Sequence, residues 1–297
     1  MEKAKRCAIF GNTYQAKTHE AVQRLFDVLK TLDIMPLIDC PFLKYLKDEM
    51  KISLPEHQII HDDVFEADLA ISMGGDGTFL TTAMRVGDKQ IPILGINTGR
   101  LGFLADFSLD DISQTLNDFL AGRLQTECCN VLQVECLEGA MNGYPFALNE
   151  VAVLKHDNSS MISIRVELGG EYLTTYQADG LIINTPTGST GYALSVGGPV
   201  MLPGSRNFGI VPVAPHGLTV RPLMLPDDLD ITLTVESRSH SFLVAIDGRS
   251  ESCMDSVRLS LRKAPYQVVV LKRPETTFLR TLRSKLLWGS DARNTCS

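Results

Sequence analysis

The spacing of apolar residues changes near residue 125, and this change most constrains what the chain can fold into. Before it, short apolar runs at 7–10, 67–73 and 92–96 alternate with longer segments in which apolar residues recur at helical spacing. This alternation is typical of β-α units around a parallel sheet. Beyond it, runs such as 162–168 and 231–235 alternate apolar and polar residues, as half-buried strands do. The sequence therefore predicts an α/β domain followed by a β-rich domain.

The end of the chain returns to a helical pattern. Apolar residues recur there at helical spacing, namely Phe278, Leu279, Leu282, Leu286 and Leu287. We therefore expect a C-terminal helix that returns to the first domain. The expected boundaries are 1–125 for the α/β domain, 126–270 for the β-rich domain and 271–297 for the C-terminal segment. A cleft is expected between the two domains.

Composition narrows the classes of partner. The chain is 44% hydrophobic and 21% charged with a net charge of -7, as in an ordinary globular protein. A mildly acidic chain has no overall attraction to nucleic acid or to an anionic membrane, although a local basic cleft stays open. No apolar stretch is long enough to cross a bilayer. We expect neither nucleic acid nor membrane as a partner.

Cysteine usage and the N-terminal sequence bear on the compartment. The seven cysteines form no C-x-x-C pair and are odd in number, so neither a disulfide framework nor a zinc site is indicated. The first residues lack the long apolar core and the cleavage site of a secretory signal. Reduced thiols and a cytoplasmic location are the expectation.

The segment Gly74-Gly75-Asp76-Gly77-Thr78 lies between a predicted strand and a helix predicted to start near Thr78. Glycines allow a sharp turn and close approach of a ligand, and N–H groups at a helix start suit phosphate oxygens. Asp76 could repel a phosphate, so it fits better as a metal partner or as a proton acceptor from a nearby hydroxyl. A plain strand-to-helix turn capped by Asp76 is about equally compatible.

A second unusual segment runs from Asp179 to Ser195 and is followed by Gly197-Gly198-Pro199. It offers hydroxyls, backbone amides and the aromatic Tyr192 for a polar, planar ligand. Taken alone, this composition is more typical of a surface turn than of a ligand site. The chain contains neither G-x-x-x-x-G-K-[ST] nor a complete G-x-G-x-x-G, so a P-loop enzyme and a typical dinucleotide dehydrogenase are not indicated.

Two polar pairs interrupt predicted strands of the second domain. Asn149-Glu150 is either a strand edge or an amide and carboxylate that bind donor groups of a ligand. Asp247-Gly248 follows the run 242–246 and is either a hairpin turn or a further polar contribution. Local sequence favours the turn.

These segments, in this order, resemble the NAD kinases. The resemblance rests on GGDGT, on NTGRLGFLAD at 97–106, on NE at 149–150, on DGLIINTPTGSTGYALS with GGP, and on IDG at 246–248. It reaches from the first strand to LRSKLLWG near the end of the chain. GGDGT alone is shared with diacylglycerol, sphingosine and phosphofructokinase relatives, whereas the long segment is far more specific.

The resemblance implies an enzyme that moves the terminal phosphoryl group of ATP, or of polyphosphate in some members, to the 2'-hydroxyl of the adenosine ribose of NAD. It implies a Rossmann-like first domain, Mg²⁺ or another divalent ion, and a homodimer or homotetramer. Asp76 would be the catalytic proton acceptor, with a phosphate loop of Gly74, Gly75, Gly77 and Thr78. A lipid kinase sharing GGDGT and a non-catalytic dinucleotide sensor are the alternatives.

The same resemblance implies a set of NAD-binding residues. They are Asp76, Gly77, Phe103, Asn149, Glu150, Asp179, Thr190, Gly191, Tyr192, Ala193, Leu194, Ser195 and Ala214. No residue is assigned to a metal. Two positions depart from the family pattern: Gln177 stands where a basic residue is frequent, and Gly191 stands where Ala is frequent. Arg100 is a further candidate for neutralising phosphate.

Overall fold

The structure is a computed structural model, and it describes residues 5–13, 19–99, 102–138, 141, 143–156, 161–255 and 257–288. The chain divides into two compact units. Unit 1 comprises residues 1–127 and 268–297, and unit 2 comprises residues 128–267. The C-terminal segment therefore groups with the N-terminal unit.

Unit 1 is built on a parallel sheet. Its elements are β1 (Arg6–Gly11), α1 (His19–Thr31), β2 (Met35–Asp39), α2 (Cys40–Asp48), β3 (Gln58–Ile60), β4 (Leu69–Gly74), α3 (Asp76–Val86), β5 (Ile93–Asn97), η1 (Leu109–Asp111), α4 (Ile112–Leu120) and α6 (Phe278–Leu286). The strand order is β3-β2-β1-β4-β5, and the neighbours pair in parallel. Because the chain moves outward from β1 to β3 and then returns to the other side of β1, the order reverses between β1 and β4. This Rossmann-like order places a ligand crevice at the carboxyl ends of β1 and β4.

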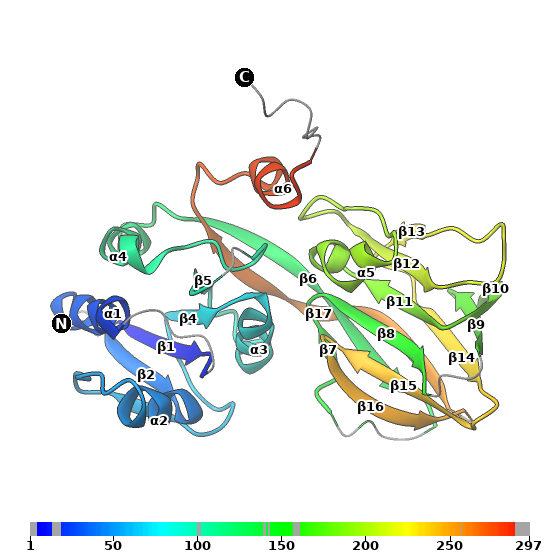
Figure 1. The fold of residues 1–297 in the computed structure, drawn as a ribbon, viewed down its shortest axis with the longest axis horizontal. Helices are drawn as coiled ribbons and strands as arrows, with labels where there is room; N and C mark the ends of the chain where they lie inside the picture. The colour runs from blue at the N-terminus through cyan, green and yellow to red at the C-terminus, as the bar shows by residue number, and fades with distance from the viewer. Residues whose placement is uncertain are drawn as a thin grey trace. The chain divides into compact units, whose positions relative to one another are not determined.

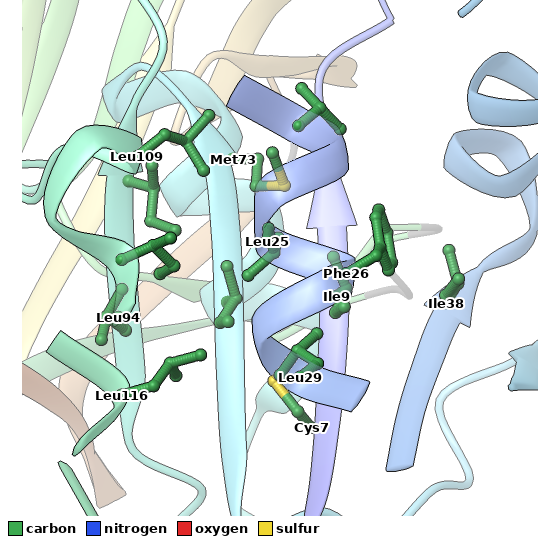
Figure 2. Close-up of a cluster of buried hydrophobic side chains, with 14 of the residues drawn as sticks. Cys7, Ile9, Leu25, Phe26, Leu29, Ile38, Met73, Leu94, Leu109 and Leu116 are labelled. Atoms are coloured by element: carbon green, nitrogen blue, oxygen red, sulfur yellow. The ribbon is translucent and has the colours of Figure 1, made fainter. Parts of the chain in front are cut away.

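Side chains of the strands point alternately to the two faces of this sheet, and their contacts show which helix covers each face. Cys7 and Ile9 of β1, with Met73 and Leu94 on the neighbouring strands, belong to the same buried cluster as Leu25 of α1. Figure 2 shows these side chains converging between α1, the sheet and the segment that carries Leu109 and Leu116. Helix α3 contacts β4, β1 and β5. A Cβ added at Gly95 would lie 2.9 Å from Phe79 of α3, so α3 packs closely on β5.

Unit 2 consists of two antiparallel layers. Its elements are β6 (Gln125–Cys136), β7 (Phe146–Ala147), β8 (Glu150–Lys155), β9 (Ile162–Leu168), β10 (Glu171–Ala178), β11 (Gly180–Asn184), η2 (Thr187–Thr190), α5 (Tyr192–Ser195), β12 (Asn207–Val213), β13 (Leu223–Pro226), β14 (Ile231–Glu236), β15 (Ser241–Ile246), β16 (Arg249–Met254) and β17 (Arg258–Lys272). One layer has the order β13-β12-β11-β8-β15-β16 (Figure 1). The other contains β10-β9-β14-β17, with β6 paired to β17. The last residues of β17 lie in unit 1, where Val270 pairs with Ile93.

The apolar residues of both layers share one core. Val151 and Val153 of β8 belong to the same buried cluster as Ile164 of β9 and Leu233 of β14. Alternate residues face the other way, and a smaller cluster there joins Ala152 of β8 to Ala193 of α5. The short helix α5 therefore packs on the outer face of the first layer, which anchors the Gly-, Ser- and Thr-rich segment to a rigid sheet.

The predicted fold class is confirmed, with an α/β unit, a β-rich unit and a C-terminal helix over Phe278–Leu286. Ser108 caps η1, because its hydroxyl accepts a hydrogen bond from the Asp110 N–H at 3.2 Å. The helix predicted near Thr78 begins at Asp76, two residues earlier. The strand predicted at 67–73 begins at Leu69.

Candidate active site

The turn between β4 and α3 lies at the switch point of the unit 1 sheet. All six residues of β4 are buried, and Gly75 follows as the N-cap of α3 in an extended conformation. No side chain caps this helix start. Asp76 is therefore the first helical residue and not the helix cap, which the sequence had left open. The first N–H groups of α3 are left for other partners.

The Asp76 carboxylate instead holds the segment after β5. Its Oδ2 accepts a hydrogen bond from the Phe103 N–H at 2.7 Å, and its Oδ1 accepts from the N–H groups of Leu104 and Ala105 at 3.0 and 3.3 Å. A carboxylate offers about four lone-pair sites. One acceptor position of Asp76 therefore remains for a ligand. These three backbone groups fix the half-buried carboxylate in place.

The glycines around Asp76 serve different purposes. A Cβ at Gly74 would collide with Thr78, and a Cβ at Gly102 would collide with the Asp76 carboxylate. A Cβ at Gly75 or Gly77 would meet nothing within 4 Å. Gly74 and Gly102 are thus required by packing, whereas Gly75 and Gly77 leave open space over the backbone at the start of α3.

Two lysines and a second carboxylate surround Phe103. The Lys272 ammonium donates to the Phe103 carbonyl at 3.3 Å and lies 3.5 Å from Asp106 Oδ2. Lys285 Nζ of α6 lies 4.8 Å from the centroid of the Phe103 ring. Burial, followed by the charge of Lys272, lowers the pKa of Lys285 to about 8 against the opposing effect of Asp76 and Asp106. Sequence analysis assigned no role to Asp106, Lys272 or Lys285, although Asp106 ends the NTGRLGFLAD segment and Lys285 lies within LRSKLLWG.

In unit 2, Asp247 fixes the polar pair Asn149-Glu150. Its Oδ2 accepts from the Leu148 N–H at 2.7 Å, and its Oδ1 accepts from the N–H groups of Asn149 and Glu150 at 2.9 and 3.1 Å. Asp247 and Gly248 have φ values of 47° and 81°, as a two-residue turn between β15 and β16 requires. The favoured hairpin turn is therefore present, and its first residue also has the structural role that the sequence left undecided.

The side chains of Asn149 and Glu150 keep unused polar atoms. Asn149 Oδ1 and Glu150 Oε2 are buried, and neither has a hydrogen-bond partner among the described residues. Burial, followed by the charge of Asp247, raises the pKa of Glu150 to about 7, while a hydrogen bond from the Tyr192 N–H lowers it. Burial also raises the pKa of Asp247 against the three N–H bonds that it accepts. Unpaired buried polar atoms are costly, so this pair is suited to bind a ligand.

The Gly-, Ser- and Thr-rich segment wraps around the same pair. Thr185 donates to the Leu148 carbonyl at 2.6 Å, and a Cβ at Gly188 would collide with the Asn149 backbone. A Cβ at Gly191 would lie 2.8 Å from Glu150 Oε2. The absence of this Cβ thus leaves room beside the carboxylate. Gly191 and Tyr192 therefore lie beside Glu150. In the helix that follows, Ala193 is buried, and Tyr192 and Ser195 are exposed.

Asp179 and Ala214 lie elsewhere in unit 2. On β11, Asn184 pairs with Glu150, whereas Gly180 pairs with Leu154 and, on the other side, with Val213. Asp179 thus lies at the opposite end of β11, about 16 Å from Asn184 at roughly 3.3 Å per residue. It forms an ion pair with Lys155, Nζ to Oδ1, at 2.8 Å. The structure does not bring these two residues to the Asn149 end of the strand.

Gln177 and Arg100 are the two remaining candidate positions. Gln177 is exposed and its amide donates to the Ser163 hydroxyl at 2.7 Å. Arg100 lies outside the described residues. Within the described ranges, no three His, Cys, Asp or Glu side chains gather into a metal site. The helices of these same ranges include none with the length and apolar character that a bilayer span requires.

Two solved structures resemble this chain over almost its whole length. The yeast NADH kinase complexed with NADH superposes with a TM-score of 0.89 at 22% identity, over 99% of this chain and 91% of that one. The NAD kinase from Archaeoglobus fulgidus in complex with ATP superposes with a TM-score of 0.74 at 27% identity, over 95% and 98% of the two chains. The first likeness shows the fold. Together they define the class as the two-domain kinases of nicotinamide coenzymes.

Sequence comparison identifies the family. The model of the ATP-NAD kinase N-terminal domain matches residues 8–124, and that of the C-terminal domain matches residues 148–272. An NAD kinase of Bacteroides fragilis is 52% identical over 96% of this chain and 99% of its own length. An NAD kinase of Flavobacterium psychrophilum is 41% identical over 97% of this chain and 100% of its own length. The chain belongs to the NAD kinase family of phosphotransferases, as the sequence motifs predicted.

Proposed function

We propose that this chain transfers the terminal phosphoryl group of ATP to the 2'-hydroxyl of the adenosine ribose of NAD, forming NADP. The observation that carries the proposal is the Asp76 carboxylate, which three backbone N–H groups hold beside an open helix start. A ribose hydroxyl becomes a competent nucleophile when its proton has an acceptor. Family membership and the two coenzyme kinase structures support this assignment.

Asp76 would accept the hydroxyl proton at the lone-pair site that the backbone leaves free. The oxygen would then form its bond to the terminal phosphorus as the bond from phosphorus to the bridging oxygen of ADP breaks. Gly74, Gly75, Gly77 and Thr78 would shape the phosphate site, because open N–H groups at a helix start suit phosphate oxygens. Phosphoryl transfer otherwise depends on positioning and charge neutralisation.

Asn149 and Glu150 would bind the ribose and nicotinamide side of NAD. Their buried, unpaired Oδ1 and Oε2 atoms support this role. Phe103, Thr190, Tyr192 and Ser195 would line the adenine and ribose pocket, with Gly191, Ala193 and Leu194 forming the backbone of the same turn.

Asp179 and Ala214 fit a different place in the assembly. Because they lie at the other end of β11 from Asn184 and Glu150, we assign them to the ligand of a neighbouring subunit in a homodimer or homotetramer. The mass of the particle in solution, measured by light scattering, tests this assignment. A monomer that forms NADP would contradict it.

A divalent ion such as Mg²⁺ belongs to the proposal as the counter-ion of ATP. The described residues do not form a cluster that fits a resident metal, so no step is assigned to a protein-held ion. An ion that keeps its waters and binds through substrate phosphates fits this donor set. A cytoplasmic location completes the proposal.

The test is purified protein with ATP, magnesium and NAD, followed by an NADP-specific coupled assay. NADP formation is expected, whereas phosphorylation of a lipid without NADP would indicate a lipid kinase. Tight dinucleotide binding without turnover would indicate a sensor.

Asp76→Asn should keep NAD binding while lowering turnover by roughly a hundredfold or more, the usual effect of losing a general base. Calorimetric NAD affinity separates this loss from misfolding. Near-normal turnover of Asp76→Asn would refute the assigned role.

A further inference from the structure

The Lys285 side chain is a buried cation whose three donors are unused. Its Nζ has less than 1 Å² of exposed surface and no hydrogen-bond partner among the described residues. The ammonium lies over the face of the Phe103 ring, 4.8 Å from the centroid. An ammonium group normally forms hydrogen bonds when it leaves water. Lys285 is therefore placed for a partner that arrives from outside the chain.

The packing of α6 does not explain this burial. Leu282 is the only fully buried side chain of α6, and Leu279 on the same helix is 57% exposed. A long side chain on such a helix can extend to water at little cost. Lys285 instead turns inward, towards the groups around Asp76.

The neighbouring charges are balanced only while Lys285 carries its proton. The carboxylates of Asp76 and Asp106 act on the Lys285 ammonium, and so does the Lys272 ammonium. Lys272 donates to the Phe103 carbonyl and lies beside Asp106, and Asp76 is already bonded to three N–H groups. A neutral Lys285 would leave two carboxylates against one cation, and that excess negative charge would repel a phosphate.

We infer that Lys285 is a phosphate-binding residue, whose ammonium donates hydrogen bonds to a phosphate oxygen of a nucleotide bound beside Asp76. The inference rests on the proposed function for the presence of phosphate at this loop. The phosphate is either the triphosphate of ATP or the diphosphate of the dinucleotide. Either source provides the charge-assisted acceptor that the ammonium lacks.

The test compares Lys285→Met, Lys285→Arg and Arg283→Met in the full-length protein by calorimetry with ATP, with NAD and with adenosine. Arg283 is an exposed cation on the same helix, so Arg283→Met removes the same charge from α6 without emptying the site. Lys285→Met should weaken binding of ATP, of NAD or of both by roughly tenfold or more, the scale of one charge-assisted hydrogen bond. Adenosine binding should not change.

Which nucleotide weakens identifies the source of the phosphate. Weaker ATP binding alone indicates the triphosphate, and weaker NAD binding alone indicates the diphosphate. Lys285→Arg should retain most of the affinity, because it restores the cation. Unchanged binding of both nucleotides by a folded Lys285→Met would overturn the inference.

A proton measurement separates this role from a structural one. Because burial lowers the pKa of Lys285 to about 8, a bound phosphate should draw a proton onto it near pH 8. Calorimetry of the wild-type protein in two buffers of different ionisation enthalpy measures that uptake, even if Lys285→Met fails to fold. No uptake by the wild type would overturn the inference.

The inference and the proposed function can fail separately. If the wild type forms NADP and a folded Lys285→Met binds both nucleotides as tightly as the wild type, only the inference fails. If Lys285→Met weakens nucleotide binding but the wild type forms no NADP, only the proposed reaction fails.

Discussion

Replacing Glu150 by Gln should make the protein more stable, and increasingly so as the pH rises. Burial and the charge of Asp247 raise the pKa of Glu150 from 4.5 to about 7. Between these values the unfolded chain loses the proton while the folded chain retains it. The stability that depends on protonated Glu150 is therefore fully present below about pH 4.5 and is lost as the pH rises through about 7. A Gln side chain keeps the shape and has no charge to bury.

The size of the effect follows from the same two pKa values. One pKa unit corresponds to about 1.4 kcal/mol, so the full shift from 4.5 to about 7 costs about 3 kcal/mol. Between pH 5 and pH 8, the advantage of Glu150→Gln in free energy of unfolding should grow by about 2 to 3 kcal/mol. Urea unfolding followed by circular dichroism at several pH values measures this difference.

Glu56→Gln is the matched control, because it removes a carboxylate from an exposed position of unit 1. Its stability difference from wild type should change little over the same pH range. Carboxyl-carbon NMR of glutamate-labelled protein gives the Glu150 pKa directly. A Glu150→Gln advantage that stays constant from pH 5 to pH 8 would refute the argument from burial.

Two further substitutions test the anchors of the site. Asp247→Asn should destabilise the protein by about 1 to 3 kcal/mol, because an amide NH₂ replaces one of the two oxygens that receive backbone N–H groups. The control is Asp33→Asn, at an exposed turn residue with φ of 53°. It should cost less than about 0.5 kcal/mol in the same urea titration. Gly102→Ala should lower the rate of NADP formation by roughly tenfold or more, since its Cβ would displace the Asp76 carboxylate. Gly143→Ala should leave this rate unchanged, because its Cβ would meet Glu251 at 3.9 Å. Equal rates for both variants would contradict the steric argument.

Much of the fold could be predicted because buried apolar residues recur in the sequence at the period of a helix or a strand. Helix α6 was predicted from its apolar spacing, and β9 from its alternation of apolar and polar residues. Short or mixed elements were not: β2 contains Pro36, and β3 has only three residues. Pairing partners were also hidden, because β17 is a single run that pairs with strands of both units. Only tertiary context decides such partners.

The parts of the candidate site that lie within one short motif could be predicted from the sequence. The contacts between residues far apart in the chain could not. Asp76 and Asn149-Glu150 stand out within their own segments. The contacts that position them do not, since Gly102 lies 26 residues after Asp76 and Asp247 lies 98 residues after Asn149. Lys285 is an ordinary helical lysine by sequence. Its burial exists only when α6 packs beside Phe103.

The surroundings of Asp76 and Glu150 suit the two carboxyl groups to different tasks. The Asp76 carboxylate accepts three backbone N–H groups and keeps one acceptor position, and the charge of Lys285 acts on it. Glu150 is buried beside a second carboxylate, and its pKa of about 7 lets it keep a proton and donate a hydrogen bond in mildly acidic solution. Glu150 is therefore suited to recognition of a ligand, whereas the remaining acceptor position of Asp76 fits the proton acceptor that we propose.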